Sequence, residues 1–292
     1  MSPTPEERIR SLGIWQGSIE IEPLSGGMTN RNYTVYDQNR KLAVRLGDDI
    51  DVHMISRANE LQASIAAFEA GISPRVVHHA PGLLVMDFIE GRALSEADVN
   101  RPEMIKRIVP LIRTCHSEVP KYFRGPTYIF WVFQVIRQYG RTLLEAEEAD
   151  IRDIRHLMQI AERLEKAAGP QMIVFGHNDL LASNILDDGE RLWLIDWDYA
   201  GFNSPLFDLG GLASNNGLSE EREVALLELY FEARVDEGLY RRYRAMKCAS
   251  LLRETMWSMV SQIHSTIQFD YAAYTAENRS RFDTALAHFD RI

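Results

Sequence analysis

The fold of this chain is decided by the stretch His177-Asn178-Asp179-Leu180-Leu181-Ala182-Ser183-Asn184, which Asp196 follows in Ile195-Asp196-Trp197-Asp198. Between these segments, the strand-like runs 184–186, Asn-Ile-Leu, and 192–195 flank the turn-forming residues 187–190, Asp-Asp-Gly-Glu. Short apolar runs on either side of such a turn predict a β-hairpin. The hairpin would place Asn184, at the start of one strand, beside Asp196 at the end of the other.

Asp179, Asn184 and Asp196 are of the residue types that phosphoryl transfer needs. The reaction requires an oriented acceptor hydroxyl and oxygen ligands for the Mg²⁺ that accompanies the phosphates. Asp179 would orient the hydroxyl and accept its proton, and Asn184 and Asp196 would hold the metal. Singly, Asp179 and Asn184 are more typical of caps and turns, but together with Asp196 they match the kinase spacing H-x-D-x-x-x-x-N followed by Asp. His177 is more typical of a residue that braces the loop than of a proton carrier.

A segment near the N-terminus predicts a phosphate-binding loop, with the residues Ser25, Gly26, Gly27, Met28, Thr29 and Asn30. Its glycines would let backbone N–H groups approach phosphate oxygens, and its hydroxyls would add donors. Because a Gly-Gly pair before a strand is usually only a turn, the interpretation depends on the strands that come after it. The runs 33–36 and 42–46 flank Asp-Gln-Asn-Arg at 37–40 and predict a second hairpin.

On the second strand of that hairpin, Ala43 and Arg45 share a face because strand side chains alternate. This matches the Ala-x-Lys geometry of kinases, in which the small residue lies against adenine and the cation reaches the α- and β-phosphates. Here the cation is Arg, whose planar fork also binds phosphate well. Glu60 lies on a helix predicted from Ser56 to Gly71. It is either the partner that holds Arg45 in position or an ordinary solvated carboxylate.

The apolar run 84–89, which precedes Gly91, predicts a hinge between two parts of the chain. Main-chain groups there, near Met86 and Phe88, would bind adenine. The residues before the hinge are typical of strands with one helix, whereas those after it carry apolar residues at helical spacing. These helical segments lie near 102–118, 127–148, 150–168, 219–234 and 239–265. We therefore predict an α+β, bilobal protein-kinase-like fold, with a nucleotide-binding lobe at 1–90, a hinge near 85–91, and a helical catalytic and acceptor-binding lobe at 91–292.

The composition and net charge of the chain disfavour several classes of function. The chain has 292 residues, of which 46% are hydrophobic, and a formal net charge of −10. Such a charge disfavours a general nucleic-acid or anionic-membrane surface and suits a cationic small substrate. The cysteines, Cys115 and Cys248, are too few and too far apart for a disulfide framework. The polar residues 1–10 have no signal-peptide core, and no apolar run approaches a membrane span. We expect a cytoplasmic protein; whether it forms a homo-oligomer stays open.

These motifs resemble those of the choline/ethanolamine kinase family, within the aminoglycoside-phosphotransferase-like superfamily of small-alcohol kinases. The resemblance runs discontinuously from about residue 24 to about 282. It includes the segment 25–30, the Arg-bearing strand at 44–46, the helix with Glu60, and the segments 195–203 and 207–209. It implies an ATP- and Mg²⁺-dependent phosphotransferase that acts on a small amino alcohol.

The resemblance also implies an acceptor pocket near the C-terminus, because Trp257 and Tyr271 fall on family positions that line the choline site. A quaternary ammonium group is held by aromatic faces and nearby carboxylates. Aromatic residues on an apolar helix are, however, usually core residues. The family helix typically carries a further aromatic residue where this chain has Glu254. A thinner aromatic box with an added carboxylate suits a primary amine as well as choline.

Three other functions are alternatives to a choline/ethanolamine-type kinase, and the sequence weighs differently on each. A kinase for another amino alcohol or for an aminoglycoside would have a pocket lined by carboxylates. A nucleotide-binding regulatory module without turnover would lack Asp179, Asn184 or Asp196, all of which are present. A protein kinase is disfavoured because residues 197–219 contain no Ala-Pro-Glu segment.

Overall fold

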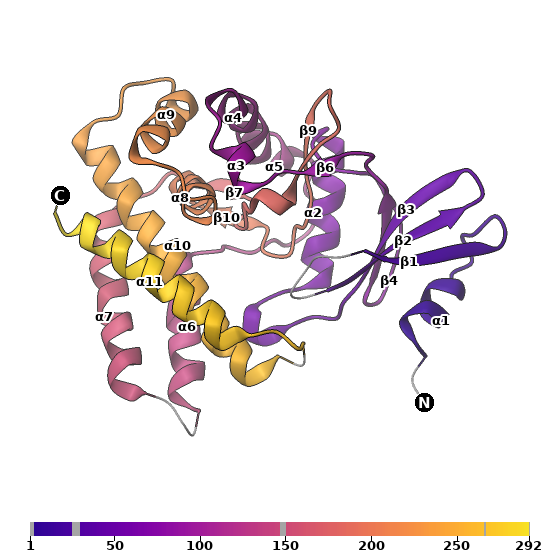
Figure 1. Cartoon of the computed structure of the whole chain (residues 1–292), viewed down its shortest axis with the longest axis horizontal. Coiled ribbons are helices and arrows are strands. Elements are labelled where there is room, and N and C mark those ends of the chain that lie inside the picture. The colour runs from indigo at the N-terminus through magenta and orange to yellow at the C-terminus, as the bar shows by residue number, and fades with distance from the viewer. Residues whose placement is uncertain (1–2, 25–29, 147–149, 266, 292) are drawn as a thin grey trace.

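The computed structural model describes the chain except for residues 1–2, 25–29, 147–149, 266 and 292. An antiparallel sheet occupies one end of the molecule and a bundle of helices the other, as Figure 1 shows. The sheet has the strand order β1-β2-β3-β5-β4 and consists of β1 (Ile19–Leu24), β2 (Arg31–Asp37), β3 (Arg40–Leu46), β4 (Val76–Ala80) and β5 (Leu83–Asp87). The predicted α+β, kinase-like fold is thereby confirmed.

The helices of the N-terminal region are α1 (Pro5–Arg10) and α2 (Arg57–Glu69). Those of the larger part are α3 (Glu96–Val99), α4 (Pro102–Ser117), α5 (Val119–Tyr122), α6 (Val132–Leu144), α7 (Ile151–Ala168), α8 (Pro205–Asn215), α9 (Glu220–Phe231), α10 (Glu237–His264) and α11 (Tyr271–Phe289). Short strands lie among them: β6 (Arg92–Ala93) pairs with the hairpin of β8 (Ile185–Asp187) and β9 (Leu192–Leu194), and β7 (Val174–Gly176) pairs with β10 (Gly201–Asn203). In the described part of the chain, no helix is both long and apolar enough to cross a bilayer.

The buried apolar residues form two clusters. The smaller one packs Ile9 of α1 against inward-facing side chains of the sheet, such as Val35 and Val85. The larger one runs through the helical part and includes Ala63 and Ala67 of α2. Helix α2 therefore shares the core of the helical part rather than that of the sheet. The predicted division at residue 90 stays a prediction.

Both predicted hairpins are confirmed. In the first, β2 and β3 pair so that Thr34 lies opposite Ala43 and Asn32 opposite Arg45. In the second, β8 and β9 pair with Leu186 opposite Trp193. Helix α2 begins where predicted, but the Ser56 side chain makes no capping hydrogen bond. The first N–H of the helix, that of Arg57, instead donates to Asp49 Oδ1 at 2.6 Å.

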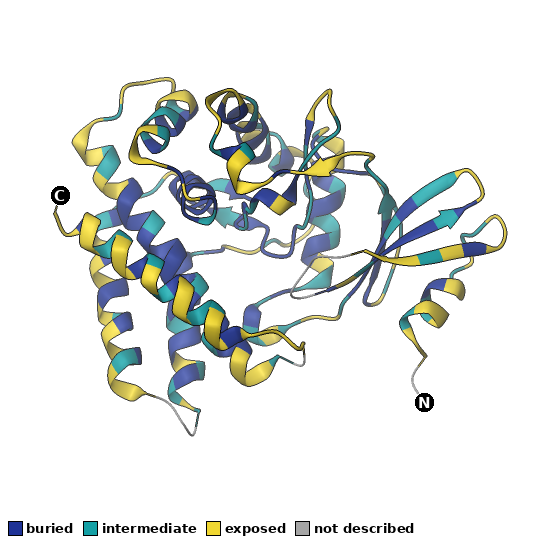
Figure 2. Ribbon diagram, in the orientation of Figure 1, coloured by how far each residue is buried: buried dark blue, intermediate teal, exposed yellow. Residues whose placement is uncertain are grey.

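One helix boundary differs from the sequence-based prediction, and two helices, α8 and α11, were not predicted. Residues 127–131 are not helical, because Phe130 N donates to Phe202 O at 2.8 Å and extends the chain along β10. Helix α8 carries no amphipathic signal because nearly all of its residues are buried, and it lies inside the helical part in Figure 2. The segment after Asp270 forms helix α11, which Asp270 caps by accepting a hydrogen bond from Ala273 N at 2.9 Å.

Candidate active site

The loop that leads to Asp179 is held by Asp208 of the buried helix α8. The carboxylate of Asp208 accepts hydrogen bonds from the backbone N–H groups of His177 at 2.8 Å and Asn178 at 2.7 Å. It also lies 3.0 Å from His116 Nε2. Three contacts to one buried carboxylate fix the backbone on which Asp179 sits. We predicted no role for Asp208, although it lies within the family-like segment 207–209.

His177 ties this loop to the strand that carries Asp196. Its Nε2 lies 2.9 Å from the carbonyl oxygen of Ile195, and its ring lies 4.8 Å from that of Trp197. Because a carbonyl oxygen only accepts hydrogen bonds, Nε2 carries the proton. Burial lowers the pKa of His177, so the ring is neutral at physiological pH. These contacts match the bracing role expected for this residue.

Asp179 and Asn184 lie in direct contact. Asn184 Nδ2 is 3.0 Å from the backbone oxygen of Asp179 and 3.3 Å from its Oδ2. Ile195 N donates to Asn184 O at 3.0 Å, so the β8–β9 hairpin places Asn184 beside the residue that precedes Asp196. The hairpin therefore gathers the residues predicted to be catalytic. Asp196 itself adopts a left-handed backbone conformation, with φ of 69°.

The Asp179 carboxyl has a strongly perturbed acidity. The surrounding protein removes water from the group and, as the largest cause, raises its pKa to about 8. The guanidinium of Arg253 acts in the opposite direction, whereas the carboxylates of Glu254, Asp196 and Asp198 add to the rise. A carboxyl with a pKa near the working pH is suited to accept a proton from an alcohol.

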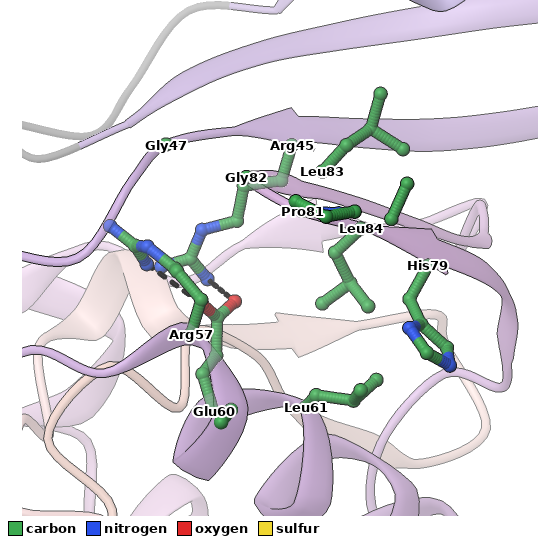
Figure 3. Close-up of a pocket in the computed structure, with 12 residues that line it drawn as sticks. Arg45, Gly47, Arg57, Glu60, Leu61, His79, Pro81, Gly82, Leu83 and Leu84 are labelled. Carbon is green, nitrogen blue, oxygen red and sulfur yellow. Dashed lines mark hydrogen bonds and ion pairs between the residues drawn. The ribbon is translucent and has the colours of Figure 1, made fainter.

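Arg45 lies in a network of carboxylates. Its Nη1 is 2.8 Å from Glu60 Oε1, as Figure 3 shows, and its Nη2 is 3.1 Å from Asp196 Oδ1. Nη2 also contacts Asp198, and Arg57 bridges Glu60 at 2.7 Å and Asp198 at 2.6 Å. The structure thus joins Arg45 to Glu60, the partner that the sequence suggested. Among the described residues of this network, three carboxyl groups face two guanidinium groups.

Asp198 is a site residue that we did not predict, although it lies within the motif 195–198. Its buried carboxylate contacts Arg45 and Arg57 and accepts a hydrogen bond from Asn30 Nδ2 at 3.1 Å. Asn30, the last residue of the predicted phosphate loop, is thus linked to the segment that contains Asp196 and Asp198. The rest of that loop, Ser25, Gly26, Gly27, Met28 and Thr29, lies outside the described residues.

A cavity of about 360 Å³ separates the sheet from the helical part. The predicted adenine-contacting residues Ala43, Met86 and Phe88 line it on the sheet side, and Asn184 and Asp196 line it on the helical side. Arg45 also borders the cavity. These predicted adenine-binding, phosphate-binding and metal-binding residues therefore line one space.

The donor atoms at this cavity fit a hard cation that arrives with a nucleotide. Asn184 uses its Nδ2 toward Asp179, and Asp196 uses Oδ1 toward Arg45. Toward the described residues, this leaves the amide oxygen of Asn184 and Oδ2 of Asp196 as possible metal ligands. Among the described residues, no three His, Cys, Asp or Glu side chains cluster so as to hold a metal by themselves. Mg²⁺ commonly binds one or two protein ligands together with phosphate oxygens and water. Asn184 and Asp196 fit such a site.

The predicted acceptor-lining residues Trp257 and Tyr271 are packed together and buried, with 4% and 6% of their surfaces exposed. Their ring centroids lie 6.1 Å apart in an edge-to-face arrangement, and Trp257 Nε1 donates to the Tyr199 hydroxyl at 2.9 Å. The His53 ring lies 5.2 Å from that of Trp257. The role of Trp257 and Tyr271 in binding the acceptor stays a prediction.

The sheet placed over a helical part, with Asp179, Asn184 and Asp196 where they meet, defines a small-molecule phosphotransferase of the kinase-like class. The family model of choline/ethanolamine kinase matches residues 21–219. The chain therefore belongs to the choline/ethanolamine kinase family, and it is an ATP:alcohol phosphotransferase.

Individual relatives agree with this assignment. The protein LicA of Haemophilus influenzae is 28% identical over 282 residues, which cover 92% of this chain and 80% of LicA. Ethanolamine kinase 2 of Mus musculus is 26% identical over 288 residues, with 88% of this chain and 73% of that protein covered. A choline/ethanolamine kinase family protein from Mesorhizobium loti has a similar structure, with a TM-score of 0.78 and 27% identity; the match covers 96% of this chain and 92% of that one.

Proposed function

We propose that this chain transfers the γ-phosphoryl group of ATP to the hydroxyl of an amino alcohol of the choline or ethanolamine type, with Asp179 as the base. The observation that carries the proposal is the contact between Asn184 and Asp179, next to a cavity that Asn184 and Asp196 line. A proton acceptor and two oxygen ligands thus stand together, as in-line transfer to a hydroxyl requires.

Each residue has a separate part in the reaction. Asp179 orients the acceptor hydroxyl and takes its proton as the oxygen attacks phosphorus. Asn184 and Asp196 would hold Mg²⁺, which neutralises charge on the phosphates when it is bound. Arg45, kept in place by Glu60, lies beside the same cavity and would direct its guanidinium toward the phosphates. Ala43, Met86 and Phe88 would enclose the adenine.

The experiment is a screen of ATP consumption by the purified protein against choline, ethanolamine, other amino alcohols and aminoglycosides. We expect Mg²⁺-dependent turnover with the first two. Asp179→Asn is the matched variant, because it keeps the size of the side chain and removes the base. It should bind ATP normally and lose at least about a hundredfold in kcat. Near-normal turnover by this variant would show that Asp179 is not the base, and turnover only with aminoglycosides would overturn the acceptor assignment.

A further inference from the structure

Helix α10 carries two adjacent charged residues, Arg253 and Glu254, whose side chains are 5% and 15% exposed. Arg253 Nη1 lies 2.7 Å from Glu254 Oε2. The Tyr274 hydroxyl donates to the other oxygen of Glu254 at 2.8 Å. These two contacts hold the Glu254 carboxylate in one orientation. The guanidinium of Arg253 also stacks on the ring of Tyr199 at 4.3 Å.

This pair belongs to the surroundings of the proposed base. The ring of Tyr199, on which Arg253 stacks, belongs to a residue whose backbone oxygen accepts a hydrogen bond at 2.9 Å from Nδ2 of Asn178, the residue before Asp179. The Tyr199 hydroxyl also accepts a hydrogen bond from Trp257, one turn beyond Glu254 on α10. These contacts connect the Arg253–Glu254 pair to the loop that carries the proposed base.

Trp257 and Tyr271, the rings predicted to hold a quaternary ammonium group, are buried and offer little open surface to a cation. The Trp257 ring lies 5.2 Å from that of His53 and, in T-shaped arrangements, 6.1 and 6.3 Å from those of Tyr271 and Tyr274. An exposed ring, that of Phe269, lies 5.1 Å from Tyr271. A quaternary ammonium group has no N–H and depends on open aromatic faces. A primary ammonium group has three N–H donors, for which a fixed carboxylate is a strong acceptor.

We propose that Glu254 binds the ammonium group of the acceptor and makes this enzyme selective for a primary ammonium over a quaternary one. The inference rests on the proposed function and names the substrate class of the same site. Each N-methyl group removes one donor and adds bulk next to a carboxylate that cannot withdraw, because Arg253 and Tyr274 hold it. Selectivity therefore comes from hydrogen bonds that the methylated acceptor cannot make.

The test is kcat/KM along the series ethanolamine, N-methylethanolamine, N,N-dimethylethanolamine and choline, at saturating Mg·ATP. For the natural enzyme, we expect the value to fall along the series, by about tenfold or more from first to last, which corresponds to about 1.4 kcal/mol. Glu254→Gln should lose about tenfold with ethanolamine and much less with choline, so that the selectivity flattens. KM for ATP should not change.

Glu277→Gln is the matched control, because Glu277 is an exposed glutamate one turn beyond Tyr274 on α11. It should keep the selectivity of the natural enzyme. Tyr274→Phe removes the hydroxyl that orients Glu254 and should reduce the selectivity in part, which provides a test even if Glu254→Gln does not fold. A preference for choline, or an equal loss on all four acceptors in the Glu254 variant, overturns the inference. Failure of every acceptor in the series would instead contradict the proposed function.

Discussion

The Asp179 carboxyl combines two properties that a surface aspartate lacks. It lies beside Asn184, which would hold the metal, and the surrounding protein raises its pKa to about 8. Arg253 opposes this rise, and Glu254 adds to it. The acidity of the proposed base is therefore set by burial together with Glu254, which we assign to acceptor recognition, and Arg253, which holds Glu254 in position.

This acidity predicts a pH dependence of activity. A base must be deprotonated to act, so kcat/KM should rise with pH, reach half of its maximum near pH 8 and level off above that pH. Glu254→Gln removes a charge that raises the pKa of Asp179, so its profile should move to lower pH. Steady-state kinetics from about pH 5.5 to about pH 9.5 would measure both effects. A profile that does not move in the Glu254 variant would argue against the coupling of the two carboxyls.

Stability gives an independent measurement of the same group. The pKa of Asp179 is higher in the folded than in the unfolded chain, so unfolding releases a proton between the two values. The stability associated with this group is complete below about pH 4 and is lost as the pH rises toward 8. The Asp179→Asn variant has no ionisable group at this position, so it does not lose stability in this way as the pH rises. Its melting temperature should exceed that of the natural protein by a margin that grows from about pH 5 to about pH 8, and a constant difference would contradict the raised pKa.

Among the secondary-structure elements, helix α2 connects the two parts of the molecule. Its Ala63 and Ala67 lie in the core of the helical part, while Glu60 reaches Arg45 on β3 of the sheet. A cavity of about 350 Å³ lies between α2 and the β4–β5 hairpin, with Leu61 on one side and Leu84 on the other. At the end of this cavity Glu60 forms ion pairs with Arg45 and Arg57, which Figure 3 shows. We expect these ion pairs to hold Arg45 in the position from which it would reach the phosphates.

Glu60→Gln should therefore raise KM for ATP with a smaller loss of kcat. The amide keeps the shape but leaves Arg45 without one of its charged partners, and truncating a buried ion pair leaves the remaining charge poorly compensated. Arg45→Lys should act in the same direction, because the ammonium lacks the paired donors of the guanidinium. The control is Glu69→Gln, an exposed glutamate at the end of the same helix. Unchanged ATP kinetics in both site variants would leave the ion pair without a role in nucleotide binding.

For the molecule as a whole, the connection between the sheet and the helical part passes through Gly91. A Cβ atom on this residue would lie 2.7 Å from the backbone oxygen of Asp187 and 3.1 Å from Cα of Asp188. The chain after β5 thus passes directly against the turn of the β8–β9 hairpin, which leads from Asn184 to Asp196. Because Gly91 also lines the cavity between the two parts, this close contact would fix the predicted hinge relative to that hairpin.

Gly91→Ala should displace this contact, since backbone atoms cannot move aside as a side chain can. We expect a destabilisation of about 1–3 kcal/mol, the usual range for an overpacked site, together with a higher KM for ATP. Thermal unfolding and steady-state kinetics would measure the two effects. Gly13→Ala is the control, because nothing lies within 4 Å of its added Cβ. A Gly91 variant as stable as the control would mean that the hinge can shift freely.

The sequence by itself determined the parts of this protein that depend on local spacing. Asp179, Asn184 and the hairpin that leads to Asp196 lie close together along the chain, so turn chemistry and strand alternation were enough to bring them together. The same holds for Ala43 and Arg45, which share one face of a strand. Helices with an apolar stripe, such as α4 and α7, were predicted for the same reason.

Only the tertiary structure decided which distant residues complete the site. Asp198 meets Arg45 across 153 residues, and Asp208 meets His116 across 92. Helix α8, which supplies Asp208, is buried on all sides and has no periodic pattern to reveal it. Whether Glu254 is a surface charge or a fixed carboxylate in the acceptor site depends on Tyr274 of the next helix. Side-chain pairs of this kind form only when packing orders both partners, and a single sequence records each residue without its partner.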